Sequence, residues 1–240
     1  MTDSLISPSR KIRKKSGYHH GDLRNAIIEA VARLIAERRS LDFQLKEIGK
    51  LVGTSSPAMY RHFESKQDLL VETAIAGYDF QENYRSFAIE QAGALPLARL
   101  LAVGHAYIHF ARTHPGYFLL MKSLETEEIL SSKRYQEQRE ETGRLMRSLV
   151  CECIDTGVFN EVDADLALAA LQATAFGIAN LYTADQLRYV APALLGDETL
   201  VARIFEVNLG NLLSPKGKRQ IAAANRNPFT PQDKPEEGKA

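Results

Sequence analysis

Apolar residues recur along most of this 240-residue chain at intervals of three and four, the spacing that places them on one face of an α-helix. Leu23, Ile27, Val31 and Leu34 follow this spacing near the N-terminus. Further helices are expected between residues 97 and 213, with breaks at glycine and proline positions. Because no stretch keeps the alternation of a β-strand for long, the pattern predicts an all-α fold.

Two short helical segments, separated by a glycine turn, precede residue 66. The first, FQLKEIGKLVG from Phe43, carries its apolar residues on one face, and its last residue, Gly53, is suited to end it. Ser55 is a good N-cap for the second segment. This order over residues 44–63 predicts a helix-turn-helix motif, whose second helix reads DNA.

The second segment presents polar side chains beside two apolar anchors. Met59 and Phe63 are four residues apart, so they share a face and are expected to pack inward. Tyr60, Arg61 and His62 are then left facing outward, where they can donate hydrogen bonds to phosphates or bases. An ordinary pair of packed helices with a solvated polar face has the same spacing, so both interpretations remain open here.

A long helix is predicted to follow directly. The stretch SKQD, which begins at Ser65, is a capping pattern that opens a helix from Lys66 toward Gln91. Free N–H groups at this helix start, together with the Lys66 ammonium, are expected to form a phosphate-binding site.

Residues 18–37, YHHGDLRNAIIEAVARLIAE, and residues 43–70, FQLKEIGKLVGTSSPAMYRHFESKQDLL, closely resemble the N-terminal DNA-binding domain of the Tet repressor (TetR) family. Several spaced elements agree in order, among them Gly53 and the run Tyr60–Phe63 followed by Lys66. The resemblance implies a homodimeric, all-helical transcription regulator, most often a repressor that a small ligand releases from DNA.

The resemblance also implies a role for each residue of the motif. Residues 56–58 would face the bases, whereas the cationic and aromatic residues around them would contact phosphates, and Arg61 could serve either purpose. The resulting DNA-contacting set is Lys46, Ser55, Ser56, Pro57, Ala58, Tyr60, Arg61, His62 and Lys66.

Two positions depart from the family pattern. Gln44 stands where a hydroxyl residue usually caps the first motif helix, and Gly49 takes a place commonly held by alanine. Both departures are expected to soften this helix without removing a contact group.

Aromatic residues and histidines concentrate after residue 77, where the family resemblance implies a ligand cavity. At helical spacing such residues pack in a core more often than they line a pocket, so both interpretations stay open. The candidate pocket residues are Tyr78, Tyr84, Phe87, His105, Tyr107, His109, Phe118, Phe176 and Tyr182. His105 and His109 also have zinc-chelating spacing, but no third ligand is evident, so neither a metal site nor a cofactor is predicted.

The last two long helices, expected at residues 163–190 and 199–213, carry the dimer hypothesis. Small residues in the first would allow close approach, and the second has an apolar face. Paired with their symmetry mates they would form a four-helix interface. The candidate interface residues are Ala173, Gly177, Asn180, Ile204, Phe205 and Leu209.

The net charge is zero, but the charges are unevenly distributed. Residues 1–66 carry 13 Lys and Arg residues against 7 Asp and Glu, which indicates an anion-binding front on an acidic body. The predicted divisions are a flexible basic arm (1–17), the helix-turn-helix domain (18–66), a ligand-binding and dimerisation domain (67–213) and a disordered tail (214–240).

The location expected for this chain is the cytoplasm. Its N-terminus lacks the apolar region of a secretory signal, and Cys151 and Cys153 are spaced as unlinked, reduced thiols. Residues 166–184 are uncharged over nearly a bilayer's length, but they contain polar residues and are rich in alanine. We therefore expect a buried helix there and no membrane contact.

An enzyme is the main competing class. Neither the Glu-x-x-His pairs of a di-iron bundle nor hydrolase and nucleotide-binding motifs occur in the sequence. A pure adaptor with a basic arm is a third class, which duplex-DNA binding would exclude. The predicted function is a sequence-specific DNA-binding regulator, not an enzyme, whose partners are double-stranded DNA, a second copy and a small effector. The ligand, the operator and the sign of regulation stay open.

Overall fold

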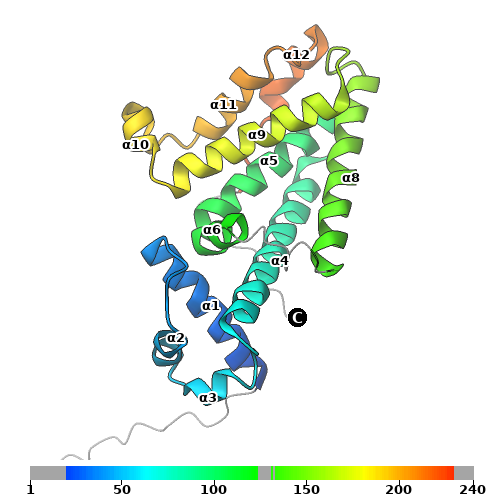
Figure 1. The fold of residues 1–240 in the computed structure, drawn as a ribbon. Helices are drawn as coiled ribbons and strands as arrows, with labels where there is room; N and C mark the ends of the chain where they lie inside the picture. The colour runs from blue at the N-terminus through cyan, green and yellow to red at the C-terminus, as the bar shows by residue number, and fades with distance from the viewer. Residues whose placement is uncertain (1–19, 124–130, 132, 230–240) are drawn as a thin grey trace, which may run out of the picture.

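The computed structural model describes residues 20–123, 131 and 133–229 (Figure 1). Figure 1 shows a small group of helices at one end, a larger helical bundle at the other, and one long helix running from the first into the second. Over the described residues the regular secondary structure is helical, which confirms the predicted all-α fold. The expected basic arm, residues 1–17, and the last part of the tail, residues 230–240, lie outside the described residues.

The N-terminal group consists of α1 (His20–Arg38), α2 (Leu45–Val52) and α3 (Ser56–Met59). These helices share one apolar core, whose buried members include Ile27, Val31, Ile35, Phe43 and Ile48. Met59 and Phe63 are also buried in it, so they anchor α3 as their four-residue spacing predicts.

The turn between α2 and α3 depends on two glycines. Gly53 adopts a left-handed conformation with φ of 70°, which costs glycine little. The Thr54 amide then donates to the Gly49 carbonyl at 2.8 Å. A Cβ atom on Gly49 would lie 3.0 Å from the Thr54 oxygen and 3.4 Å from the Met59 sulfur. Close approach of α3 to α2 is thus a structural reason for glycine at position 49.

The long helix is α4 (Lys66–Ala92), which joins the two halves of the molecule. It opens at Ser65, whose hydroxyl accepts a hydrogen bond of 3.0 Å from the Asp68 amide, as the capping pattern predicts. Its first turns pack against α1 and bury Leu69, whereas its later turns bury Tyr84 against α5. The domain boundary predicted at residue 66 falls on the first residue of this helix.

The C-terminal bundle surrounds a central helix. Its elements are α5 (Pro96–Thr113), α6 (Pro115–Ser123), α8 (Lys133–Asp155), α9 (Ala164–Thr183), α10 (Leu187–Val190), the 3₁₀ helix η1 (Pro192–Leu194), α11 (Leu200–Leu209) and α12 (Pro215–Ala224). Most side chains of α5 are buried, because α4, α6, α8, α9 and α12 all pack on it.

The single helix predicted over residues 163–190 is divided in two. α9 ends at Thr183, Asp185 adopts a positive φ of 55°, and α10 begins at Leu187. Neither glycine nor proline marks this break, although aspartate tolerates the left-handed region better than most residues. The Asp185 carboxylate pairs with Arg188 at 2.6 Å, which closes the turn.

The prediction of a disordered tail from residue 214 is wrong as far as residue 229. Ser214 caps α12, and the chain beyond this helix returns to the bundle. There Asn225 Oδ1 lies 3.0 Å from Nε2 of the buried His105, and the Phe229 ring stacks on His109 with 4.3 Å between centroids. Composition indicated a solvated chain, but these two side chains find partners on α5 that are far away in sequence.

One face of α9 is buried and the other is not. By length and composition alone this helix could cross a membrane; its most apolar window has a mean hydropathy of 1.3, and 22% of that window is buried. Ala167, Leu171 and Ile178 face inward, whereas Leu166 and Phe176 are exposed. The expectation of a buried helix therefore holds on one side only.

α6 contacts both halves of the molecule, and its backbone lies close to the backbone of α1. It packs on α1 as well as on α4 and α5. A Cβ atom on Gly116, in the first turn of α6, would lie 1.8 Å from the Ala32 carbonyl oxygen of α1. Only glycine allows this contact, which holds α1 against the bundle.

Gly116→Ala is expected to lower the free energy of unfolding by about 2 kcal/mol, because an added methyl group must push α6 away from α1. Urea unfolding followed by circular dichroism measures the change. Gly143→Ala is the matched control, since no heavy atom lies within 4 Å of a Cβ atom added there and α8 should gain up to ~1 kcal/mol. Equal losses in the two variants would contradict the role of Gly116.

Candidate DNA-binding surface and ligand cavity

α3 is short, and the turn after it carries most of its polar display. The Ser55 hydroxyl caps the helix by accepting a backbone hydrogen bond of 3.3 Å. Tyr60, Arg61 and His62 follow the last helical residue in a turn, in which the His62 amide donates to the Met59 carbonyl at 2.9 Å. The expectation that these three residues lie on one helix is therefore corrected: they occupy consecutive positions of a tight turn.

The side chains from position 56 to position 62 differ in their exposure to solvent. Pro57, Tyr60 and Arg61 are exposed, whereas Ser56, Ala58 and His62 are half-buried. Tyr60 is 55% exposed, although a large aromatic residue usually finds partners. An exposed phenol beside an exposed guanidinium offers two kinds of donor for phosphate oxygens.

Charged side chains cap the start of α2. Lys46, in the first turn of this helix, is exposed. The backbone N–H of Gln44 donates to the Glu47 carboxylate at 2.7 Å, and the Arg38 guanidinium donates to the same carboxylate at 2.6 Å. Both hydrogen bonds lower the pKa of Glu47, to about 2, and the one from Arg38 contributes most. Glu47 thus supplies the cap that the Gln44 side chain was expected to supply poorly.

Lys66 has a structural role that the sequence did not predict. Its ammonium donates to the carbonyl oxygens of Leu41 at 2.9 Å and Phe43 at 2.8 Å, and it lies 4.2 Å from the centroid of the Phe43 ring. These contacts tie the loop before α2 to the start of α4. An ammonium has three N–H groups, so one remains for the phosphate contact, which stays a prediction.

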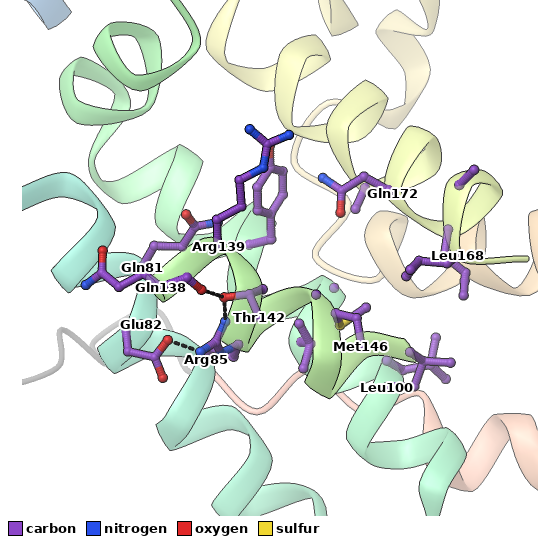
Figure 2. A pocket seen from close by; sticks show the side chains of 18 of the residues that line it. Gln81, Glu82, Arg85, Leu100, Gln138, Arg139, Thr142, Met146, Leu168 and Gln172 are labelled. Atoms are coloured by element: carbon purple, nitrogen blue, oxygen red, sulfur yellow. Dashed lines mark hydrogen bonds and ion pairs between the residues drawn. The ribbon is translucent and has the colours of Figure 1, made fainter. Parts of the chain in front are cut away.

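The C-terminal bundle contains a cavity of about 630 Å³, partly open to solvent, between α4, α5, α6, α8, α9 and α11. This volume is in the range of sites that hold drug-sized ligands. Figure 2 shows the labelled polar side chains of α4 and the start of α8 toward one side, and Leu100, Met146 and Leu168 toward the other. One side of the cavity is thus polar, and the other is mainly apolar, with Gln172 of α9 beside Leu168.

Two of the nine candidate pocket residues, Tyr78 and Tyr107, line this cavity. The other candidates lie elsewhere in the described structure: Tyr84, Phe87, His105, His109, Phe118, Phe176 and Tyr182. Phe118 packs edge-on against Tyr107 from outside the cavity, with 5.7 Å between ring centroids. Phe176 is exposed on α9, and Tyr182 lines a separate, smaller pocket beside Arg112. For the other five residues the core interpretation fits better than the pocket interpretation.

An aromatic cluster explains three of the misplaced candidates. Tyr84, Phe87 and His109 surround Phe229, with ring centroids 5.7, 5.6 and 4.3 Å from its own. The Tyr84 hydroxyl also lies 3.0 Å from Nε2 of His114. Because the C-terminal segment covers these rings, they form core rather than cavity wall.

The histidine pair considered for metal has other partners. Burial lowers the pKa of His105, and the bond to Asn225 partly offsets this shift. His109 stacks on Phe229 instead of facing His105. Nowhere in the described ranges do three His, Cys, Asp or Glu side chains gather closely enough to hold a metal ion.

Sequence reasoning missed the polar lining of the cavity. The missed residues are Gln81, Glu82, Arg85, Lys122, Gln138, Arg139, Thr142, Asp165 and Gln172. A signal was present on α4, where positions 78, 81, 82 and 85 recur at intervals of three and four and therefore share a face. A polar face within an otherwise buried helix indicates a polar occupant.

Part of the predicted dimer interface is buried within one chain. Phe205 is 2% exposed and Leu209 is 1% exposed, so these two assignments are wrong. Phe205 fits against Gly104, where an added Cβ would lie 2.7 Å from its ring, and it closes one wall of the cavity. The apolar face of α11 thus packs on its own bundle. Of the remaining candidates, Ile204 is half-buried, whereas Ala173, Gly177 and Asn180 are exposed.

Two family models match this chain. Residues 27–73 match the model for bacterial regulatory proteins of the tetR family, and residues 100–203 match that for the tetracyclin repressor-like C-terminal domain. The first match covers α2, α3 and much of α1, and the second covers most of the cavity wall. No curated protein matches the sequence.

Solved structures share the fold. A protein of unknown function from Rhodococcus sp. RHA1 has a TM-score of 0.66 at 25% identity, over 83% of this chain and 100% of its own. The ketosteroid transcriptional regulator KstR2 of Mycobacterium tuberculosis has a TM-score of 0.63 at 21% identity, over 80% and 95%. AibR, in complex with isovaleryl coenzyme A and operator DNA, has a TM-score of 0.52 at 18% identity, over 67% and 85%.

Arg61→Ala tests the phosphate alternative for Arg61, under which binding to all duplexes should weaken alike. The exposed guanidinium would lose one phosphate contact, so the slope of log K against log salt should fall by about 0.9. Fluorescence anisotropy with a labelled duplex at several salt concentrations measures this slope. Arg219→Ala, on the exposed surface of α12, is the control. A slope that Arg61→Ala leaves unchanged would exclude the phosphate contact of Arg61.

Lys66→Met keeps most of the apolar stem and removes the ammonium. It should lower the free energy of unfolding by about 1–3 kcal/mol, because the Leu41 and Phe43 carbonyls lose a charged donor. Thermal unfolding measures the loss, and Lys50→Met, at an exposed position of α2, should cost little. Unchanged stability together with a lower salt slope would show that Lys66 serves DNA rather than the loop.

Proposed function

We propose that this chain, which belongs to the TetR family of bacterial transcriptional regulators, is a homodimeric repressor that a small molecule releases from a pseudo-palindromic operator. The observation that carries the proposal is the course of α4. This helix begins beside the DNA-contacting turn and its later turns line the cavity. A ligand in the cavity would then act on the same helix that positions the DNA reader. Such a regulator would act in the cytoplasm, where the chromosome lies.

The DNA reader comprises α3 and the turn that follows it. A major groove about 12 Å wide admits one such element. In the proposed complex Ser56, Pro57 and Ala58 face the bases, Lys46, Tyr60, His62 and the last free N–H of Lys66 contact phosphates, and Arg61 reaches a phosphate or a guanine. Ser55 uses its hydroxyl oxygen for the helix cap and keeps its O–H for a phosphate.

An exposed apolar surface on α9 and α11 supports the homodimer. Leu166, Phe176 and Val207 are exposed, Val207 by 79%. The small or short residues Ala173 and Gly177 lie on the same side of α9 and would let a second helix approach closely. Burying this surface against its symmetry mate would place two readers on successive major grooves, hence the two-fold operator.

The coupling path combines one rigid helix and one close contact. From Lys66 to Arg85, α4 spans about 28 Å at a rise of ~1.5 Å per residue. Midway, Gly77 lies so close to α6 that an added Cβ would be 2.7 Å from the Met121 sulfur. A ligand that spreads α4 from α8 would therefore carry α6 and the reader with it. To cause release it must bind the DNA-free arrangement more tightly than the DNA-bound one.

AibR supports the combination of ligand and operator on this fold, because it is described in complex with both isovaleryl coenzyme A and operator DNA. The proposal takes from it only that combination.

Binding to DNA from its own promoter tests the proposed function. The full chain should bind a labelled duplex of that promoter at least about a thousandfold more tightly than a scrambled duplex of equal length. Electrophoretic mobility shift at physiological salt measures both affinities. Equal affinity for the two duplexes would contradict a sequence-specific regulator.

Ala173→Arg is expected to split the dimer, because it places a charge at the centre of the proposed interface. Sedimentation velocity should show a monomer, and affinity for the promoter duplex should fall at least about tenfold since each half-site binds alone. Ala222→Arg, on the exposed side of α12, is the control and should remain dimeric. A dimer that survives Ala173→Arg would place the interface elsewhere.

A further inference from the structure

We infer that the cavity takes an organic acid, whose carboxylate binds Arg85 and whose apolar body lies among the leucine and methionine side chains at the other end. The inference rests on the proposed function, because it names the chemistry of the effector. It depends on three features of the cavity. A buried arginine has N–H donors to spare, polar and apolar side chains line different sides, and the described lining residues include more cations than acids.

Arg85 is the buried cation at the polar end. It is 8% exposed, and it donates one hydrogen bond to Thr142 of α8 and another to Glu82 of its own helix. A guanidinium has five N–H donors, so within the described part of the chain three are left without a side-chain acceptor. A carboxylate can accept two of these remaining donors side by side.

A second polar group at this end is also incompletely satisfied. The amide nitrogen of Gln138 donates to Asp79 at 2.8 Å, but its Oε1 is buried without a hydrogen-bond partner among the described residues. Gln138 lines the cavity close to Arg85 and Thr142, as Figure 2 shows. This acceptor needs a donor, which an ionised carboxylate lacks, so a water bound between the carboxylate and Gln138 Oε1 would satisfy both.

The opposite end of the cavity is mainly apolar. The apolar side chains that line the cavity include Leu100 and Leu101 of α5, Met146 of α8, Leu168 and Leu171 of α9 and Phe205 of α11. Gln172 of α9 is the labelled polar residue on the side of Leu168. Figure 2 shows Leu100, Met146 and Leu168 on the side away from Gln81, Glu82 and Arg85. An occupant that matches both ends has a polar head and an apolar body, which gains free energy by leaving water.

The charge of the lining selects an anionic head. Among the described residues that line the cavity, Arg85, Lys122 and Arg139 are cationic and Glu82 and Asp165 are acidic. Each acid already has an arginine partner: Glu82 pairs with Arg85, and Asp165 pairs with Arg147. A cationic ligand at this end would compete with the buried Arg85 guanidinium for Glu82, whereas an anion would give the guanidinium a further acceptor.

Binding at Arg85 also couples the head group of the ligand to the position of the DNA reader through α4. The Arg85–Thr142 hydrogen bond links α4 to α8, and it is the guanidinium of this bond that the carboxylate would engage. A change in that link moves α4 relative to α8. The acid group, rather than the apolar body alone, would therefore set the ligand's power to release DNA.

Octanoate, 1-octanol and octylamine, which share one alkyl chain, test the inference on the full wild-type chain without DNA. Isothermal titration calorimetry should show octanoate binding at least about tenfold more tightly than 1-octanol, with octylamine weakest. Octanol binding as tightly as octanoate, or no octanoate binding at millimolar concentration, would overturn it. This comparison does not depend on the folding of any variant.

The variant Arg85→Gln tests whether Arg85 is the residue that binds the carboxylate. It should weaken octanoate binding at least about tenfold and leave 1-octanol binding within about twofold, since only the head group loses its partner. Arg219→Gln, at an exposed position of α12, should change neither. Octanoate affinity that survives Arg85→Gln would overturn the assignment.

The two proposals fail separately. A chain that binds its promoter duplex but not octanoate keeps the proposed function and loses this inference. A chain that binds octanoate through Arg85 but no duplex keeps the cavity chemistry and loses the role as a regulator.

Discussion

A rigid helix cannot shift at one end without carrying its other end, and α4 buries side chains in both halves of this molecule. Leu69 belongs to the core that supports the DNA-contacting turn, whereas Tyr84 and Arg85 belong to the bundle around the cavity. The contact of Gly116 with the backbone of α1 adds a second attachment between the halves. Any occupant of the cavity that moves α4 must therefore move the reader, which makes this helix the central element of the proposed regulation.

The DNA-contacting region could be predicted from the sequence because its signals are local. Gly53, Ser55 and the capping pattern at Ser65 act within one turn of the chain, and the structure places all three at helix ends. Even there, tertiary contacts changed one role. The Lys66 ammonium binds the carbonyls of a loop more than twenty residues away, and no local pattern encodes that contact.

The cavity and the C-terminal segment could not be predicted in the same way. Phe229 is core only because His109 and Tyr84 are beside it, and Phe205 faces the bundle only because Gly104 leaves room for its ring. An aromatic residue at helical spacing fits a core, a pocket or an interface equally well. Arg85 was the more informative residue, because a cation on the inward face of a helix needs a partner and so indicates a site.

The distance between the two readers of a dimer tests the central claim most directly. A spin label at Glu64→Cys, an exposed position beyond the turn, in a chain with Cys151→Ser and Cys153→Ala, reports it by pulsed electron resonance. With promoter duplex bound, the account predicts one narrow distribution near the ~35 Å separation of successive major grooves, and a broader or shifted one without DNA. No inter-subunit distance, or a distribution that DNA leaves unchanged, would contradict it.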